Sequence, residues 1–223
     1  MTYKLAGAIL VQHTPEGAWF PVIRPYTPIH DSSARGQIQL VVKQYPGGTA
    51  STYLHSLSVG QNLTVRGPIP GYSWKPSATA RDVLFVAGGA GITPVYSLAS
   101  SILSNPNDKS KIQIVWGVNS SRDMVLEHEL EALERQYPDR LRVTYCISGD
   151  GPQSDKGTSK YRRGRVDRLA LQEAVSRFRS ESWGDEKGVK VFLSGPPAME
   201  DALAGKGGVL QQLGVEKRHV HRF

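Results

Sequence analysis

The sequence lacks several features that define whole classes of protein. Only one of its 223 residues, Cys146, is a cysteine, so a disulfide scaffold is excluded. No apolar run reaches the roughly 18 residues that a membrane-spanning helix needs. Residues 1–5 also lack the basic, apolar and small-residue pattern of a signal peptide. We therefore expect an intracellular protein with no membrane span in this chain, in a reducing or redox-neutral compartment.

The patterns for two kinds of chemistry are missing as well. The six histidines show no metal-ligand spacing, so no metal site is expected. No Ser/His/Asp arrangement with a nucleophile turn is present, so nothing supports hydrolysis. We expect Cys146 to lie at a strand end in the core without a redox role, and Trp74 and Trp116 to be packing residues.

The residues that are present give an ordinary soluble globular composition, 39% hydrophobic and 21% charged. The formal net charge is +7, but acidic residues are interleaved with basic ones, and we expect no binding to nucleic acid. The densest basic cluster is predicted to lie in a surface loop, which is either simply solvated or docks an acidic partner or a phosphate. Its members are Lys156, Lys160, Arg162, Arg163 and Arg165.

The first part of the chain alternates short apolar runs with Gly/Pro turns, a pattern typical of a small antiparallel barrel or sandwich. Strands are predicted over residues 8–11, 36–42 and 62–66, and a short amphipathic helix over residues 51–57.

From about residue 81 the pattern changes to strand and helix in alternation, which predicts a parallel, doubly wound sheet with right-handed crossovers. Strands are predicted over 83–87, 112–116, 141–145 and 189–193, and helices over 94–103, 126–137, 167–178 and 197–204. We place the boundary between 76 and 81, giving two domains, 1–80 and 81–223.

Two segments follow predicted parallel strands at the sheet edge where ligands bind in open α/β folds. Residues 88–94, Gly-Gly-Ala-Gly-Ile-Thr-Pro, run into a helix N-terminus, which suits a pyrophosphate. Residues 194–199, Ser-Gly-Pro-Pro-Ala-Met, turn abruptly and start a helix at proline. Each segment alone fits nucleotide binding and a tight strand-to-helix turn about equally well.

Two more segments lie in the barrel half. Residues 24–28, Arg-Pro-Tyr-Thr-Pro, offer a charge for phosphate, a ring for stacking and a hydroxyl, although a Pro-bracketed edge strand explains them too. Residues 47–51, Gly-Gly-Thr-Ala-Ser, form a second glycine loop before a helix, with Ser51 expected at a capping position. An ordinary turn and N-cap is the alternative.

Taken in order, these four segments resemble the ferredoxin-reductase-type flavoproteins, and among them the NADH–cytochrome b5 reductases. Residues 24–28 match the family's Arg-x-Tyr-Thr/Ser flavin motif, 47–51 its pyrophosphate loop, and 88–94 its nicotinamide-dinucleotide loop. Residues 194–199 match its Cys-Gly-Pro-Pro-x-Met signature, and the chain ends in an aromatic residue, Phe223. Residues 66–76 and 105–109 look most like the fungal mitochondrial branch.

The resemblance implies two lobes: a β-barrel that holds FAD over residues 1–80, and a Rossmann-like α/β domain that binds NAD(P)H over residues 81–223. Hydride would pass from the nicotinamide to flavin N5. The implied catalytic residues are Thr27 and Ser194. The implied cofactor-binding residues are Arg24, Pro25, Tyr26, Thr27, Val42, Lys43, Gly47, Gly48, Thr49, Ala50, Ser51, Gly89, Thr93, Pro94, Asp123, Gly195, Pro196, Met199 and Phe223.

The resemblance also implies individual roles on the flavin side. Arg24 would contact the FAD pyrophosphate, Tyr26 would lie against the isoalloxazine, and Thr27 would hydrogen-bond near N5. Gly48 and Ser51 would hold phosphate. The ribityl and adenosine portions would pass the strand that contains Val42 and Lys43.

On the nicotinamide side, Gly89, Thr93 and Pro94 would border the nicotinamide and diphosphate. Asp123 would accept the adenine-ribose hydroxyls and repel a 2′-phosphate, which favours NADH over NADPH. Arg122 beside it could reverse that preference.

The sequence departs from the family in two places. Ser194 replaces the usual cysteine near nicotinamide C4. Alignment of donor and acceptor supplies most of the rate and needs no thiol, so we expect turnover to be slowed by the smaller serine but not abolished. The first barrel strand is also missing before Ala6, so we expect an N-terminally shortened barrel that retains FAD less well, unless residues 1–4 pair there.

These features predict a monomeric, FAD-dependent, NADH-preferring oxidoreductase that releases single electrons to an acidic haem protein such as cytochrome b5. The basic surface, including Lys75, would steer that acceptor. An oxygenase, a ferredoxin-like protein or a quinone is the alternative acceptor, and a nucleotide-binding member without turnover is the alternative class. The family branch suggests a mitochondrial location, in the outer membrane or the intermembrane space, and a cytosolic one is the alternative.

Overall fold

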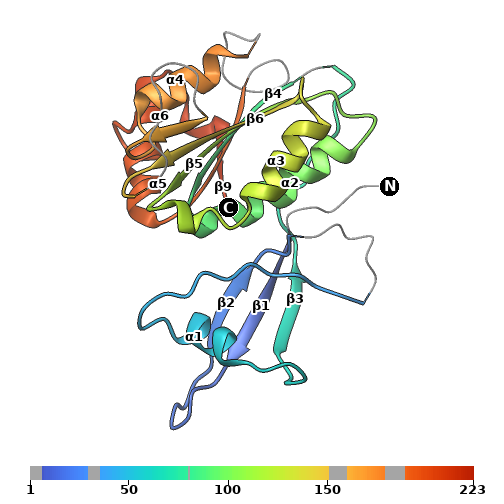
Figure 1. Cartoon of the computed structure of the whole chain (residues 1–223), viewed down its shortest axis with the longest axis vertical. Helices are drawn as coiled ribbons and strands as arrows, with labels where there is room; N and C mark the ends of the chain where they lie inside the picture. The colour runs from blue at the N-terminus through green and yellow to red at the C-terminus, as the bar shows by residue number, and fades with distance from the viewer. Residues whose placement is uncertain (1–6, 30–35, 80, 151–159, 179–188) are drawn as a thin grey trace. The chain divides into compact units, whose positions relative to one another are not determined.

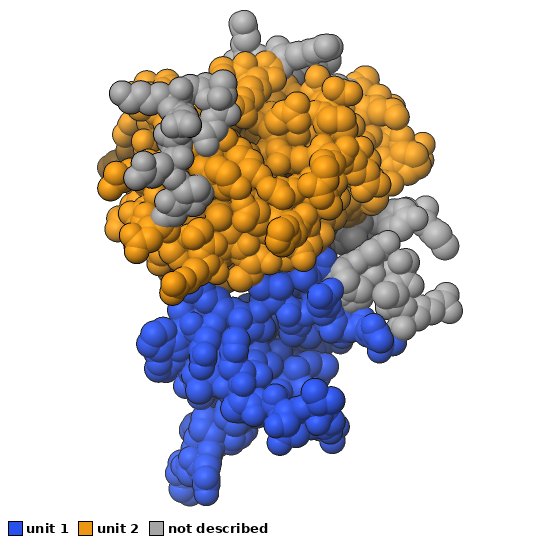
Figure 2. All heavy atoms as spheres, in the orientation of Figure 1, with its two compact units in different colours: residues 1–74 blue, residues 75–223 orange. Residues whose placement is uncertain are grey.

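The computed structural model of the chain describes residues 7–29, 36–79, 81–150, 160–178 and 189–223. The chain divides into two compact units, residues 1–74 and 75–223 (Figure 2). Each unit has its own sheet. The binding of FAD by residues 1–80 and of NAD(P)H by residues 81–223 stays a prediction.

The first unit contains a three-stranded antiparallel sheet in the order β2-β1-β3, with one helix beside it (Figure 1). Val11 is fully buried at the centre, opposite Arg24 on one neighbouring strand and Val65 on the other. The antiparallel character predicted for this half is therefore confirmed. The elements are β1 (Ala8–His13), β2 (Val22–Tyr26), α1 (Thr49–Ser56) and β3 (Thr64–Ile69).

One predicted strand of this unit is wrong. Residues 36–42 have the apolar content of a strand but are not part of a strand ladder. The segment is held by isolated contacts instead: Ile29 N–H donates to Gln39 O at 3.1 Å, and His55 Nε2 lies 2.9 Å from Val42 O. Composition alone could not reveal that none of the strands in the described part of this unit pairs with it. Residues 1–4, the expected partner of the shortened barrel, lie outside the described residues.

The second unit is built on a parallel sheet, as predicted. The sheet has six strands, in the order β7-β6-β5-β4-β8-β9, where the sequence predicted four. Its strands are β4 (Asp82–Gly88), β5 (Lys111–Val118), β6 (Leu141–Ile147), β7 (Tyr161–Arg163), β8 (Lys190–Ser194) and β9 (Val220–Arg222). Its α-helices are α2 (Ile92–Ser104), α3 (Glu127–Gln136), α4 (Arg168–Ser176), α5 (Pro197–Ala204) and α6 (Val209–Gln212). Short 3-10 turns occur at η1 (Gly89–Gly91), η2 (Ser121–Asp123) and η3 (Lys217–His219).

Helices cover both faces of this sheet. Figure 1 shows α2 and α3 on one face and α4, α5 and α6 on the other. All of β4 is buried, and the rings of Phe85 and Phe192 stack at 5.0 Å between adjacent strands. Strands buried on both faces read as continuous apolar runs, which is why the sequence predicted them well. Cys146 lies buried in β6, where burial raises the pKa of its thiol to about 12.

The predicted basic loop is partly a strand. Tyr161–Arg163 forms β7 and pairs with β6, and the Tyr161 ring packs against Tyr145. Lys160 and Arg162 form ion pairs with Glu131 and Glu173, so these two charges are already neutralised. Lys156 lies outside the described residues. Among the helices that the structure describes, none has the length and apolar character that crossing a membrane requires.

Candidate nucleotide-binding site

Two turns interlock at the carboxyl edge of the parallel sheet. β4 lies between β5 and β8, so the strand order reverses at β4: the strands that follow it in sequence are added on one side as far as β7, and on its other side from β8 onward. Ligands bind outside the carboxyl ends of the strands at such a switch point. The turn after β4 contains Gly88 and Gly91, and the turn after β8 begins at Ser194, which is buried. A Cβ atom on Gly91 would lie within 3.0 Å of Ser194 O, which is closer than real Cβ atoms approach.

Gly88 makes a similar close approach to the second turn. A Cβ atom there would lie within 3.0 Å of Met199 Sδ and 2.9 Å from Pro196 Cδ. Gly195 packs back onto Gly88, since its own Cβ would lie 3.2 Å from Gly88 Cα. The glycines are therefore required by the packing of one turn on the other.

The N-terminus of α2 opens at this edge. Gly91 is its N-cap and no side chain caps it, so the positive end of the helix dipole is left for an anion. Thr93 is buried in the first turn and its Oγ1 donates to Ala90 O at 3.2 Å. Pro94 follows and has no N–H of its own. These residues form a closed turn that is buried or half-buried throughout.

Trp116 supports the same turn from the neighbouring strand. It lies opposite Ala87 in β5, is fully buried, and donates its Nε1–H to Gly89 O at 3.0 Å. Sequence reasoning treated Trp116 as a packing residue and missed this bond. Its position at the carboxyl end of a predicted parallel strand was the available signal.

Asp123 lies after β5, at the same sheet edge. Its Oδ2 accepts hydrogen bonds from Ser120 N at 3.1 Å and Ser120 Oγ at 3.2 Å, in a capping box. Ser121 N–H donates to Asp150 O at 3.1 Å and ties this turn to the end of β6. Asp123 is half-buried and Arg122 is exposed, so the carboxylate is the better-fixed charge of the two.

Phe223 reaches the carboxyl end of β8 from the last strand. Its N–H donates to Leu193 O at 3.1 Å, and its ring lies 5.8 Å from that of Phe192. The His221 ring contacts the Phe223 ring edge-on, with the ring centroids 5.2 Å apart. The structure therefore places the C-terminal aromatic one residue from Ser194 in the sheet, on the edge where the two glycine turns meet.

The first unit contains a separate glycine loop. Gly47 has φ +72° and Gly48 is the N-cap of α1, again with no side-chain cap. The expectation that Ser51 caps this helix is wrong, because α1 begins two residues earlier. Ser51 closes the loop instead: its Oγ accepts from Tyr45 N at 3.2 Å and donates to Gly48 O at 3.3 Å.

An open hollow of about 470 Å³ lies against this loop. One wall is the stacked pair of His13 and Tyr53, whose rings are parallel at 3.7 Å. The lining residues are His13, Gly47, Gly48, Thr49, Thr52, Tyr53 and Ser56. Backbone donors at one end and an aromatic pair at the side suit a nucleotide.

The predicted flavin motif lies at the end of β2. Arg24 is exposed and its guanidinium donates to the neighbouring Ile23 O at 2.9 Å. Tyr26 is half-buried, and this burial raises the pKa of its hydroxyl even though Arg24 opposes the shift. Pro25 is exposed and Thr27 is half-buried directly after the strand. Val42 and Lys43 are half-buried in the extended segment that His55 holds.

The structure brings most of the predicted residues together in two groups, one in each unit. The others lie elsewhere in the first unit and do not line the hollow at its loop: Arg24, Pro25, Tyr26, Thr27, Val42 and Lys43. Gly47, Gly48, Thr49, Ala50 and Ser51 form the loop of the first unit. Gly89, Thr93, Pro94, Asp123, Ser194, Gly195, Pro196, Met199 and Phe223 lie at one edge of the parallel sheet. Their roles toward cofactors stay predictions.

Comparison with known proteins supports this division. The oxidoreductase FAD-binding domain family matches residues 1–74, and the oxidoreductase NAD-binding domain family matches residues 85–204. Among solved structures, the cytochrome b5 reductase domain of Ulva prolifera nitrate reductase has a TM-score of 0.80 and 30% identity. That match covers 98% of this chain and 84% of the other.

Curated relatives extend over nearly the whole chain. NADH–cytochrome b5 reductase 2 of Neurospora crassa is 38% identical over 98% of this chain, which spans 63% of that protein. The protein of the same name from Emericella nidulans is 37% identical over 98% of this chain, which spans 67% of it. The chain therefore belongs to the ferredoxin-reductase-type oxidoreductases, which join an FAD-binding domain to an NAD-binding domain and include the NADH–cytochrome b5 reductases.

Proposed function

We propose that the chain is an FAD-dependent oxidoreductase that takes hydride from NADH and passes single electrons to a haem protein such as cytochrome b5. The observation that carries this is the interlock of Gly88 and Gly91 with the turn at Ser194, at the switch point of a parallel sheet. The two matched domain families and the names of the relatives support the same reaction.

The residues of the first unit fit FAD. The hollow of about 470 Å³ ends at the uncapped N-terminus of α1, which suits a pyrophosphate. When bound, FAD supplies a ring nitrogen that accepts hydride and a ring system that can release the electrons one at a time. The chain itself supplies binding and orientation.

On the flavin side we assign Arg24 to the charge of the pyrophosphate, Tyr26 to the face of the isoalloxazine and Thr27 to a hydrogen bond near N5. Backbone groups of the loop would hold phosphate, while Ser51 keeps the loop closed. Other contacts would come from Pro25, Val42, Lys43, Gly47, Gly48, Thr49 and Ala50.

On the nicotinamide side the turn at Gly89, Thr93 and Pro94 would border the nicotinamide and diphosphate. Ser194 would lie near the C4 atom that gives up hydride, with Gly195, Pro196, Met199 and Phe223 around it. Asp123 would accept the adenine-ribose hydroxyls and disfavour a 2′-phosphate, so NADH would be preferred to NADPH.

We further propose that the protein acts as a monomer and docks an acidic haem protein through exposed basic residues. Arg163 and Arg165 are exposed in the described part of the basic cluster, and Lys75 is exposed near the start of the second unit. The resemblance to the fungal mitochondrial branch supports a mitochondrial location, which fractionation of the native organism would test.

The first experiment is to purify the protein with excess FAD, record its visible spectrum, and add NADH without oxygen. A flavin spectrum that bleaches supports both nucleotide sites and the hydride transfer. Bound flavin that NADH leaves oxidised would favour a binding protein without turnover, or NADPH as donor. Protein that stays colourless with added FAD would contradict the proposal. Adding oxidised cytochrome b5, a ferredoxin or a quinone to the reduced protein then identifies the acceptor.

A further inference from the structure

The bond between Trp116 and Gly89 has a directional effect on the glycine turn. Trp116 Nε1–H donates to Gly89 O at 3.0 Å, and the indole is fully buried beside β4. In a trans peptide the carbonyl and the following N–H point in opposite directions. Holding Gly89 O toward the indole therefore directs the N–H of Ala90 away from the indole and its packed face of the sheet.

The backbone of Gly89 has more conformational freedom than that of other residues, so a bond that fixes its carbonyl matters there. Its φ is +51°, a region that glycine enters freely, and a Cβ there would meet nothing within 4 Å. Side-chain packing at Gly89 therefore does not set the orientation of its peptide. Two donors hold the Gly89 carbonyl: the backbone N–H of Ile92 within the 3-10 turn, and the indole N–H of Trp116, which is the described side-chain group on it. The indole N–H is buried, so leaving it unpaired would be costly.

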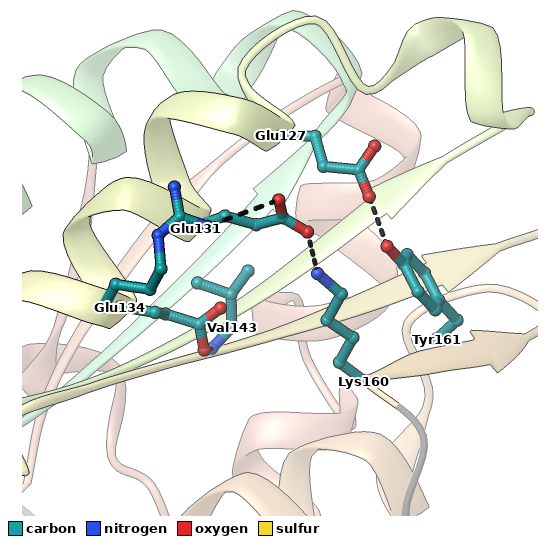
Figure 3. A network of polar contacts seen from close by, with 7 residues as sticks. Glu127, Glu131, Glu134, Val143, Lys160 and Tyr161 are labelled. Atoms are coloured by element: carbon teal, nitrogen blue, oxygen red, sulfur yellow. Dashed lines mark hydrogen bonds and ion pairs between the residues drawn. The ribbon is translucent and has the colours of Figure 1, made fainter. Parts of the chain in front are cut away.

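The indole itself is held by a row of aromatic side chains. Trp116, Tyr145 and Tyr161 lie opposite one another on β5, β6 and β7, with ring centroids 5.8 and 5.4 Å apart. Figure 3 shows how α3 fixes the end of this row: Glu127 accepts a hydrogen bond from the Tyr161 hydroxyl, and Glu131 pairs with Lys160. Trp116 therefore presents its N–H from a fixed position.

We infer that Trp116 is a positioning residue for the dinucleotide: by holding Gly89 O, it aims the Ala90 N–H at the phosphate-binding edge of the glycine turn. This rests on the proposed function of that turn. A buried strand residue, 27 positions away in sequence, would thus orient a backbone donor that meets NADH.

The test is Trp116→Phe, which keeps a ring in the row and removes the N–H. The matched control is Tyr145→Phe, because the Tyr145 hydroxyl is buried without a hydrogen-bond partner and the residue belongs to the same row. Binding of NADH is measured by anaerobic calorimetry on each FAD-loaded protein after its flavin has been reduced with dithionite. Reduction of the oxidised flavin is followed separately at saturating NADH.

Trp116→Phe should weaken NADH binding about five- to tenfold, the change expected from losing one well-placed hydrogen bond, while Tyr145→Phe binds as the unaltered protein does. The rate at saturating NADH should change much less than the dissociation constant. Equal NADH binding by Trp116→Phe and the unaltered protein would overturn the inference and leave the proposed function standing. If the unaltered protein binds no NADH, both fall.

A second measurement does not depend on how the variant folds. In the unaltered protein with ¹⁵N-labelled tryptophan, the Trp116 indole N–H should exchange slowly with solvent, and its resonance should shift when NAD⁺ is added. A resonance that stays in place at saturating NAD⁺ would contradict the inference.

Discussion

Gly91 and Ser194 are in direct backbone contact, although more than a hundred positions of sequence separate them. A Cβ atom on Gly91 would lie within 3.0 Å of Ser194 O and 2.9 Å from Gly195 N. Both neighbours are backbone atoms, which cannot rotate away as a side chain can. The two turns of the candidate site therefore share one well-defined packing arrangement.

Gly91→Ala should separate these turns. We expect a loss of about 2 to 3 kcal/mol in the free energy of unfolding and a loss of NADH binding, because the backbone at Ser194 must move. Thermal unfolding and NADH calorimetry measure the two effects. Gly207→Ala is the control: Gly207 has φ +71° and open space around it, so its variant should lose about 1 kcal/mol and bind NADH normally. Normal NADH binding by Gly91→Ala would refute this prediction.

Gly48→Ala should disturb the glycine loop of the first unit. Its Cβ would lie 2.6 Å from Ser51 Oγ and 3.1 Å from Tyr45 O, so the bonds that Ser51 makes across the loop would be lost. We expect FAD binding to weaken about tenfold or more, which corresponds to roughly 1.4 kcal/mol, while NADH binding is unchanged. Flavin content after gel filtration measures this. Gly60→Ala, with open space at φ +91°, should keep its flavin.

Ser194→Cys should speed flavin reduction. Ser194 is buried at the end of β8, where the family usually has cysteine, and the larger thiol would restrict the nicotinamide more closely. We expect a rise of about three- to tenfold, equivalent to roughly 0.7 to 1.4 kcal/mol in the barrier. Anaerobic stopped-flow at saturating NADH gives the rate. An unchanged rate would argue against a role for this side chain.

The ion pair between Glu131 and Lys160 should depend on pH. The hydrogen bond from Lys160 lowers the pKa of Glu131 below its ordinary 4.5. A carboxyl whose pKa is lowered by folding adds stability above its unfolded pKa and loses it as the pH falls through the folded pKa. A double-mutant cycle with Glu131→Gln and Lys160→Met should give a coupling of about 0.5 to 1 kcal/mol at pH 7. That coupling should disappear in acid.

The more exposed pair of Glu216 and Arg218 is the comparison for that cycle. Their side chains are 60% and 72% accessible, so their coupling should be close to zero at every pH. Chemical denaturation at pH 7 and at acid pH measures both cycles. Equal coupling for the two pairs at pH 7 would show that partial burial of Lys160 has no energetic effect.

The parallel half of the fold was predictable because its strands are buried on both faces and read as unbroken apolar runs. β7 was not predicted as a strand, since three residues carry too little periodicity, and β9 was indicated only by the alternation of His219 and His221. Residues 36–42 were predicted as a strand in error: they have strand-like residues, but they pair with none of the strands that the structure describes. The start of α1 was placed two residues late because its N-cap is Gly48, which gives no side-chain signal.

The candidate site likewise has parts that could be predicted from the sequence and parts that could not. Motifs that lie within one turn, such as the residues after β4 and β8, can be recognised in the sequence because all their residues are close together in the chain. The contact of Trp116 with Gly89 joins two strands through a side chain, and no local pattern encodes it. The loop-closing role of Ser51 was obscured because serine near a helix start usually caps it.

The order of the strands has a consequence during synthesis. β8 inserts beside β4 only after more than a hundred intervening residues have left the ribosome, and the N–H of the last residue, Phe223, donates to β8. A nascent chain that ends at α4 would expose one side of β4 and have only one of the two turns. Binding of a dinucleotide at this sheet edge can therefore stabilise only molecules in which β8 is in place, so cellular NADH would favour them over molecules that terminate before β8.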